Sequence, residues 1–306
     1  MALNQFPASQ SPQRLTAGFT SDPPYGPLAE SGFSNPFFYH QFSDDFDNAL
    51  GSTTNGLYTA SGGGTIAHSS GDGGLALFTT LTAVNSFESI QLPVGDFTLP
   101  PTGSAPPGTS ASQKKLFYLA RLQLNTNVTT ESFIAGLAII TATPYTTGVA
   151  SITDGLFFYK PPGGTVLEVI NIASTGNDPA GVGFTNTFVV PTAAYSLVAG
   201  TSIDLAYYID KYQNIRIYVG SQLVGWIPQS GTGAVNAAGV PVLPVLGPVA
   251  ANYNYLAQGV TPTGATNVNP VRFTTAVLSP TLAVSNGTTA GIVTMTSDFH
   301  MAQKER

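Results

Sequence analysis

The sequence has no cysteine and very little charge, and each shortage excludes a class of proteins. Without cysteine among its 306 residues, the chain cannot form disulfides, thiolate zinc sites or a cysteine nucleophile, so packing alone must hold the fold. Charged residues make up 8% of the chain, against about a quarter in an ordinary soluble domain. Much of the surface must therefore carry Thr, Ser, Asn, Gln, Gly and Ala. Such a surface suits burial against neighbouring molecules.

Basic residues are few and scattered, which argues against nucleic acid and anionic membranes as partners. The net charge is −6, the isoelectric point is near 4.8, and among the ten basic residues only Lys114 and Lys115 are adjacent. Binding to phosphate-rich surfaces needs clustered Lys and Arg. The longest apolar stretches, around 134–140 and 239–251, are too short or too broken by proline to span a bilayer. The N-terminus lacks the basic and apolar regions of a secretory signal, so we expect synthesis in a cytoplasm.

Glutamate and histidine are sparse, which predicts a protein that is not an enzyme. Glu occurs only at positions 30, 88, 131, 168 and 305, and no Glu-x-Asp or Glu-x-Glu pair places two carboxylates on one strand face for glycoside hydrolysis. The three histidines, at 40, 68 and 300, have no metal-ligand spacing. No P-loop, dinucleotide fingerprint or Gly-x-Ser-x-Gly elbow occurs. We therefore predict no catalytic residue, no cofactor and no bound metal, although a Ser-His-Asp triad assembled by folding stays open.

The densest charge cluster is the segment FSDDFD at 42–47, which has two interpretations. Asp44, Asp45 and Asp47 could contribute oxygen ligands to Ca²⁺, but the twelve-residue calcium loop pattern is missing. Alternatively, the segment is a first edge strand, with Phe42 and Phe46 anchoring it and the carboxylates discouraging edge-to-edge aggregation.

Residues 1–40 differ from the rest of the chain and predict an extended N-terminal arm. Six prolines and many Ser and Gly deny this segment a helix or a central strand. A solvated linker would not need its eight large apolar residues, so they either pack back onto the chain's own domain or dock on another subunit. These residues are Phe6, Leu15, Phe19, Tyr25, Phe33, Phe37, Phe38 and Tyr39, of which the seven aromatic ones are the candidate partner contacts.

Residues 41–306 consist of short β-type runs separated by Gly, Pro, Asn and Asp turns, which predicts an all-β sandwich. Alternation in 115–124 puts Leu116, Tyr118 and Leu122 on one face and Arg121 on the other. A hairpin is expected to turn at Gly220. The expected strands are 64–69, 74–80, 86–92, 115–124, 132–141, 155–160, 166–173, 187–190, 202–209, 214–219, 222–227, 271–278 and 291–296.

A long segment at 228–270 interrupts the strand pattern and predicts an inserted loop. It is rich in Gly, Ala, Val, Pro and Asn, and long ordered loops usually carry a function. Trp226, at its start, and Tyr253 and Tyr255, in its middle, are the candidate residues of a second contact, where aromatic rings could stack on sugars.

Several segments in order resemble a family of tailed-bacteriophage virion proteins. They are NPFFYH at 35–40, FSDDFD at 42–47, DGGLAL at 72–77, KLFYLAR at 115–121, FIAGLA at 133–138, TDGLFFYK at 153–160, IYVG at 217–220 and AQKER at 302–306. The resemblance implies a jelly-roll (concanavalin A-like, laminin-G-like) sandwich and no catalytic residues. It also implies a capsid cement or decoration protein on the virion exterior, bound to the major capsid protein.

Two functions follow as expectations. In the first, the chain is a capsid cement protein that docks through its arm, and because closed symmetric oligomers are the rule we expect a homotrimer. In the second, it is a lectin-like module of a head or tail fibre that binds a host-surface glycan.

Overall fold

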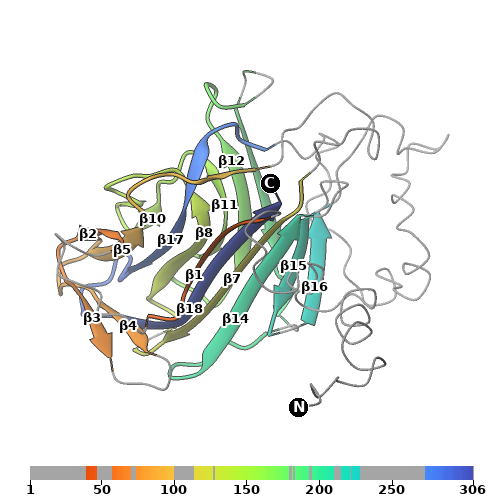
Figure 1. The fold of residues 1–306 in the computed structure, drawn as a ribbon. Helices are drawn as coiled ribbons and strands as arrows, with labels where there is room; N and C mark the ends of the chain where they lie inside the picture. The colour runs from red at the N-terminus through yellow and green to blue at the C-terminus, as the bar shows by residue number, and fades with distance from the viewer. Residues whose placement is uncertain are drawn as a thin grey trace, which may run out of the picture.

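The computed structural model describes residues 39–46, 57–69, 74–99, 114–126, 128–178, 181, 183–192, 195–209, 215–220, 222–227 and 273–305. These residues form two eight-stranded antiparallel sheets that pack face to face (Figure 1). The all-β jelly-roll sandwich predicted from the sequence is confirmed. No helix in the described ranges is long and apolar enough to cross a membrane.

The first sheet contains eight strands. Its strands follow one another in space as β16, β15, β14, β7, β18, β4 and β3, and β1 lies beside the second half of β18. Their bounds are β16 (Gln222–Ile227), β15 (Ile215–Val219), β14 (Ser202–Ile209), β7 (Leu116–Leu124), β18 (Thr294–Glu305), β4 (Leu75–Thr79), β3 (Thr65–Ser69) and β1 (Tyr39–Asp44).

The second sheet follows the order β13, β12, β11, β8, β17, β5 and β2, with β6 paired to the start of β17. Its bounds are β13 (Phe184–Val189), β12 (Glu168–Ala173), β11 (Gly155–Lys160), β8 (Ser132–Ala138), β17 (Val277–Ser285), β5 (Phe87–Gln91), β2 (Thr59–Gly62) and β6 (Phe97–Thr98). A separate small hairpin joins β9 (Tyr145–Thr146) and β10 (Val149–Ala150). Because β7 and β8, and again β17 and β18, lie in different sheets, the chain crosses repeatedly between the layers.

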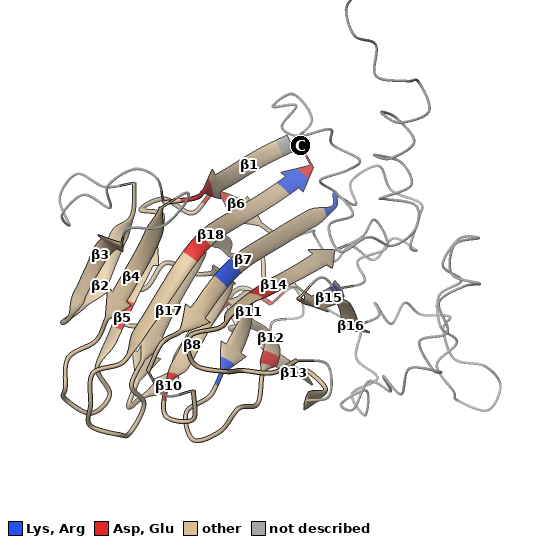
Figure 2. Cartoon of the chain, turned by 90° about the horizontal axis from the view of Figure 1, so that it is seen from below, with Lys and Arg blue, Asp and Glu red and all other residues tan. Residues whose placement is uncertain are grey.

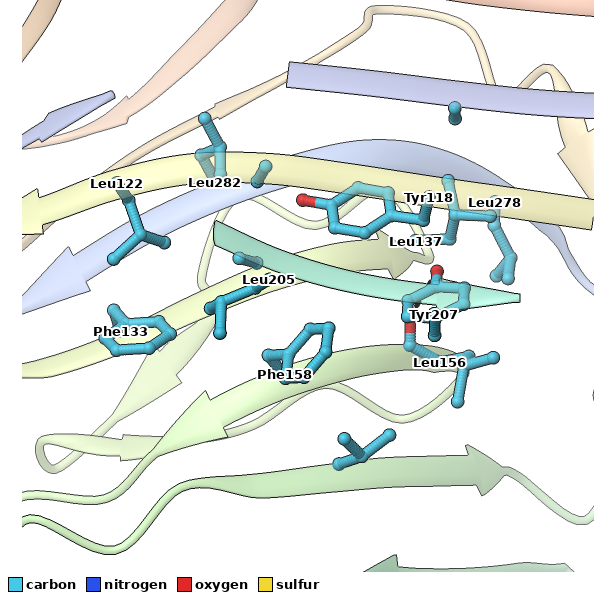
Figure 3. Close-up of a cluster of buried hydrophobic side chains, with 14 of the residues drawn as sticks. Tyr118, Leu122, Phe133, Leu137, Leu156, Phe158, Leu205, Tyr207, Leu278 and Leu282 are labelled. Carbon is cyan, nitrogen blue, oxygen red and sulfur yellow. Dashed lines mark hydrogen bonds between the residues drawn. The ribbon is translucent and has the colours of Figure 1, made fainter. Parts of the chain in front are cut away.

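The core lies between the two sheets and follows the predicted alternation. In β7, Leu116, Tyr118 and Leu122 are buried in this core, as expected. The ring of Tyr118 stacks on that of Tyr207 from β14, with centroids 5.0 Å apart, and the Tyr207 hydroxyl donates a hydrogen bond to a backbone carbonyl of β11 at 2.9 Å. Figure 3 shows how side chains of β7 and β14 meet those of β8, β11 and β17 across the interior.

Two expected strands near the C-terminus have the wrong bounds. The sequence predicted strands at 271–278 and 291–296, whereas β17 spans Val277–Ser285 and β18 continues to Glu305. Proline is rare in central strands, yet β17 continues through Pro280. Pro280 is tolerated because it lies at the change of partner: Leu278 pairs with β6, and the pairing with β5 begins at Thr281.

The hairpin predicted at Gly220 is confirmed. It joins β15 and β16, and Gly220 adopts a positive φ of 55°, which glycine adopts without steric cost. The arm residues 1–38 and the insertion 228–270 lie outside the described residues.

Candidate binding face

The outward-facing side of the first sheet, opposite the core, collects side chains from four neighbouring strands. Strand registers place them in rows across β18, β7, β14 and β15, so that residues far apart in sequence become neighbours. We call this surface the outer face; its residues are Phe117, Leu119, Arg121, Gln123, Asp204, Ala206, Tyr208, Arg216, Tyr218, Phe299, Met301 and Gln303, together with Asp298 at the register shift of β18.

One end of the outer face is polar and open, and Arg121 lies at its centre. Its guanidinium donates to both carboxylate oxygens of Asp204, at 2.6 and 3.1 Å, and to Asp298 at 3.4 Å. The side chain of Arg121 is 48% exposed, so this ion-pair network meets solvent. The hydrogen bond and charge of Asp204 raise the pKa of Arg121 above its ordinary value. In Figure 2 an acidic segment of β18 lies beside a basic segment of β7.

Further polar groups continue this end of the outer face. The Gln123 amide donates to Asn125 at 2.7 Å, and the Ser202 hydroxyl donates to the Gln123 carbonyl oxygen at 3.3 Å. Phe299 is half-buried and lies in register with Arg121. We call Arg121, Gln123, Asp204, Asp298 and Phe299 the polar half. Their planar groups are held by their neighbours, so they offer donors and acceptors in fixed directions beside one aromatic ring.

The other end of the outer face is apolar and buried. Phe117, Ala206, Tyr208, Tyr218 and Met301 form one cluster, separate from the main core. We call these five residues the apolar half. The guanidinium of Arg216 lies 5.9 Å from the ring centroid of Tyr208, a distance at which a cation is attracted to an aromatic face.

Buried carboxylates elsewhere serve the structure. Asp154 accepts hydrogen bonds from the Thr274 hydroxyl at 2.7 Å and from the Ser174 amide at 3.0 Å, and Glu131 accepts one from the Thr126 amide at 3.0 Å. Among the described residues, no group of three His, Asp or Glu could hold a metal ion. That the protein is not an enzyme stays a prediction, and these contacts offer no acid and base in an open cleft.

The acidic segment after the arm forms an edge strand. Strand β1 (Tyr39–Asp44) pairs with β18, and Phe46 is fully buried, so the edge-strand interpretation of 42–47 is confirmed for its first three residues. Residues 39 and 40, which the sequence assigned to the arm, belong to this strand. Both carboxylate oxygens of Asp44 already accept hydrogen bonds, from the Phe46 amide and the Tyr58 hydroxyl, each at 2.8 Å. These bonds compete with the calcium ligation considered above.

Most of the predicted contact residues lie outside the described ranges, and two of them frame the outer face. Tyr39 begins β1 and pairs with Glu305, and Trp226 in β16 pairs with Arg216. The backbones of Tyr39 and Trp226 thus lie toward opposite edges of the sheet. The residues not described are Phe6, Phe19, Tyr25, Phe33, Phe37, Phe38, Tyr253 and Tyr255.

The sequence did not predict the ion-pair network, although it indicated that the side chains of two of its members point outward. Alternation in 115–124 placed Arg121 opposite the core side of its strand, and the same period of two in 202–209 gives Asp204 an outward direction. The pairing of β7 with β14 brings these two residues together from positions 83 apart in the sequence. A single sequence carries no signal for that pairing.

Three solved structures illustrate what the chain is similar to. The CBM2 module of the evolved Dit of Lactobacillus casei BL23 phage J-1 shares 8% identity with a TM-score of 0.43, covering 87% of this chain and 96% of that one. The Bacteroides ovatus mixed-linkage glucan GH16 shares 9% identity with a TM-score of 0.45, covering 85% and 98%. The T. cruzi calreticulin globular domain shares 12% identity with a TM-score of 0.45, covering 85% and 86%. Likeness of this degree is no evidence about a ligand.

No protein-family model matches the sequence, and no curated protein matches it. The resemblance to tailed-phage virion proteins therefore stays a prediction.

Proposed function

We propose that this chain is a non-catalytic carbohydrate-binding module and that the polar half of the outer face is its binding surface. The observation that carries the proposal is the exposed network of Arg121 with Asp204 and Asp298 on the outward side of an eight-stranded sheet. Groups held in place before binding lose little conformational freedom when a ligand arrives.

The chemistry of the polar half suits sugar hydroxyls. A hydroxyl both donates and accepts, and here a guanidinium and an amide that donate stand beside carboxylates that accept. Phe299 adds an apolar surface for the C–H side of a sugar ring. Because the basic group and its two acidic partners leave only a small net charge, the surface favours a neutral glycan over a polyanion.

The experiment starts from a glycan array with the full-length chain, followed by calorimetry on the best ligand. Removing a charged hydrogen-bond donor typically costs about 1.5–3 kcal/mol, so Arg121→Gln should weaken binding about tenfold or more. Asp204→Asn should act similarly. Arg216→Gln, the same change in the same sheet but outside the polar half, should leave affinity within about twofold. Unchanged binding by a folded Arg121→Gln protein contradicts the proposal.

A virion role is a second proposal, favoured by the position of β1. Because β1 is an edge strand of the sandwich, the arm that precedes it joins the domain at an edge, which favours contact of residues 1–30 with a neighbouring subunit. We propose that Phe6, Phe19 and Tyr25 dock on a major capsid protein on the outside of a phage head and that the decorating unit is a homotrimer. Their joint replacement by alanine should abolish binding to undecorated heads. Full occupancy by that variant would refute the docking role, and mass photometry tests the trimer.

A further inference from the structure

The apolar half of the outer face is buried, although no described strand lies over it. Phe117 is 0% exposed and Tyr218 only 2%, yet both lie on the side of the first sheet that faces away from the second. Antiparallel sheets commonly leave one face in water. The burial of these rings therefore requires a covering layer from outside the described strands.

The outward side of the second sheet is covered by a segment of the chain that is not one of its strands. Its own outward side carries Ile134, Phe157 and Tyr159, and the segment between β8 and β11 covers them. Tyr145 and Ile152 from that segment join the same buried cluster. On that sheet, the cover is a short piece of chain adjacent in sequence to the strands it covers.

Two buried side-chain amides show that the covering layer must also supply hydrogen bonds. Gln303 is 1% exposed, and neither its amide nitrogen nor its amide oxygen has a hydrogen-bond partner. It lies opposite Gln41, whose amide oxygen is also buried and unpartnered. Leaving such groups unsatisfied costs stability. An extended backbone has free N–H and C=O groups and would satisfy both residues.

We propose that residues 31–38 of the same chain lie across the apolar half and cover it. This segment runs directly into β1, where Tyr39 pairs with Glu305 and Gln41 with Gln303, so its last residue is three residues from the row it must cross. It carries Phe33, Phe37 and Phe38 and no charged residue. In the proposed arrangement, its phenylalanine rings would pack against the aromatic rings of the apolar half.

The reach of the segment fits the width of the row. The row from Gln303 through Phe117 and Tyr208 to Arg216 crosses three strand spacings, or about 14 Å. Eight extended residues span up to about 27 Å. The polar half then stays open beside the covered half, and residues 1–30 stay free to engage a partner.

Cross-linking in the full-length chain tests the proposal. The natural sequence has no cysteine, so Ser34→Cys/Leu119→Cys contains the only two thiols; Leu119 lies in β7, in register with Met301 and Ala206. A short bismaleimide at low micromolar protein should link most molecules internally, shown by mass spectrometry of the monomer. Leu223→Cys in β16, opposite Tyr218, replaces Leu119→Cys if that variant melts early.

Two further pairs make the outcome decisive. Ser34→Cys/Val94→Cys, with Val94 64% exposed before β6, should stay unlinked and controls for random encounter. Ala251→Cys/Leu119→Cys tests the insertion as the alternative cover. Three results would overturn the proposal. The first is internal linkage of the Ala251 pair in place of the Ser34 pair. The others are linkage only between two molecules, and no linkage in either pair. The readout uses no sugar, so its failure is separate from failure of the carbohydrate proposal.

Discussion

His300 should make the stability of the sandwich sensitive to mild acid. The residue is fully buried in β18, where its ring packs edge-on against Phe42 of β1 and Tyr118 of β7, with centroids 5.5 and 5.4 Å away. Neither ring nitrogen has a hydrogen-bond partner. Burial lowers the pKa of His300 to about 3, so the imidazole stays neutral in the folded protein at ordinary pH.

The sign and size of the effect follow from proton linkage. Below an unfolded pKa of about 6.5, the unfolded chain binds a proton at His300 that the folded chain does not, so stability falls as the pH falls. Between about pH 7.5 and about pH 5 the loss is about 2 kcal/mol, and it approaches about 5 kcal/mol near pH 3, where the folded protein also takes the proton.

Urea unfolding at about pH 7.5 and at about pH 5 measures this loss of stability. The variant His300→Leu cannot titrate there, so its stability should change by about 2 kcal/mol less than that of the wild type between the two pH values. Burial raises the pKa values of Glu88 and Glu168, which act in the opposite direction, but they cancel in the difference between the two proteins. His68→Gln, at an exposed position of β3, is the matched control and should keep the wild-type slope. An unchanged slope in His300→Leu would refute the argument.

Three further predictions concern the buried framework. Burial, opposed by the charge of Glu131, lowers the pKa of Lys160 to about 8. The unfolded chain therefore holds the Lys160 proton to higher pH, and the free energy of unfolding should rise by about 2 kcal/mol between about pH 7 and about pH 9.5. Urea unfolding of Lys160→Met should show no such rise. A Cβ on Gly136 would lie 2.4 Å from the Cα of Phe157 in the paired strand, so Gly136→Ala should cost about 3 kcal/mol by the same assay. Burial raises the pKa of Asp154, but hydrogen bonds from Thr274 and its other donors outweigh this and lower it. Asp154→Ala should cost about 2 kcal/mol near neutral pH, and the penalty should shrink as the pH falls through the lowered pKa.

The sequence predicted strand bounds best where turn residues flank the strand. Strands β11, β14 and β16 have the predicted bounds, because Gly, Pro, Asp or Ser next to their ends marks where each begins and stops. The prediction failed around Pro280, where β17 continues although proline is rare in central strands, because the place of a proline in a strand depends on where a neighbouring strand ends. That information is tertiary and is absent from local sequence.

The sequence predicted the outward direction of one residue of the candidate site but not its contacts. The outward direction of Arg121 follows from the pattern of its own strand, whereas its contact with Asp204 depends on pairing between distant strands. The arm and insertion residues chosen from the sequence were picked for their aromatic character alone. None of them has a described side chain, so their roles stay predictions.

A signal for the covered face was nevertheless present in the sequence. In β7, Phe117 stands between the core residues Leu116 and Tyr118, and in β15 Tyr218 stands between Ile217 and Val219, where a two-layer sandwich would place polar residues. Strand β11 has the same continuous apolar run, and a described segment covers its outward side. A break in alternation therefore indicates burial on both faces. By that rule the first sheet needs a third layer over its apolar half, while the return of Arg121 and Gln123 farther along β7 marks where that layer ends and the open surface begins.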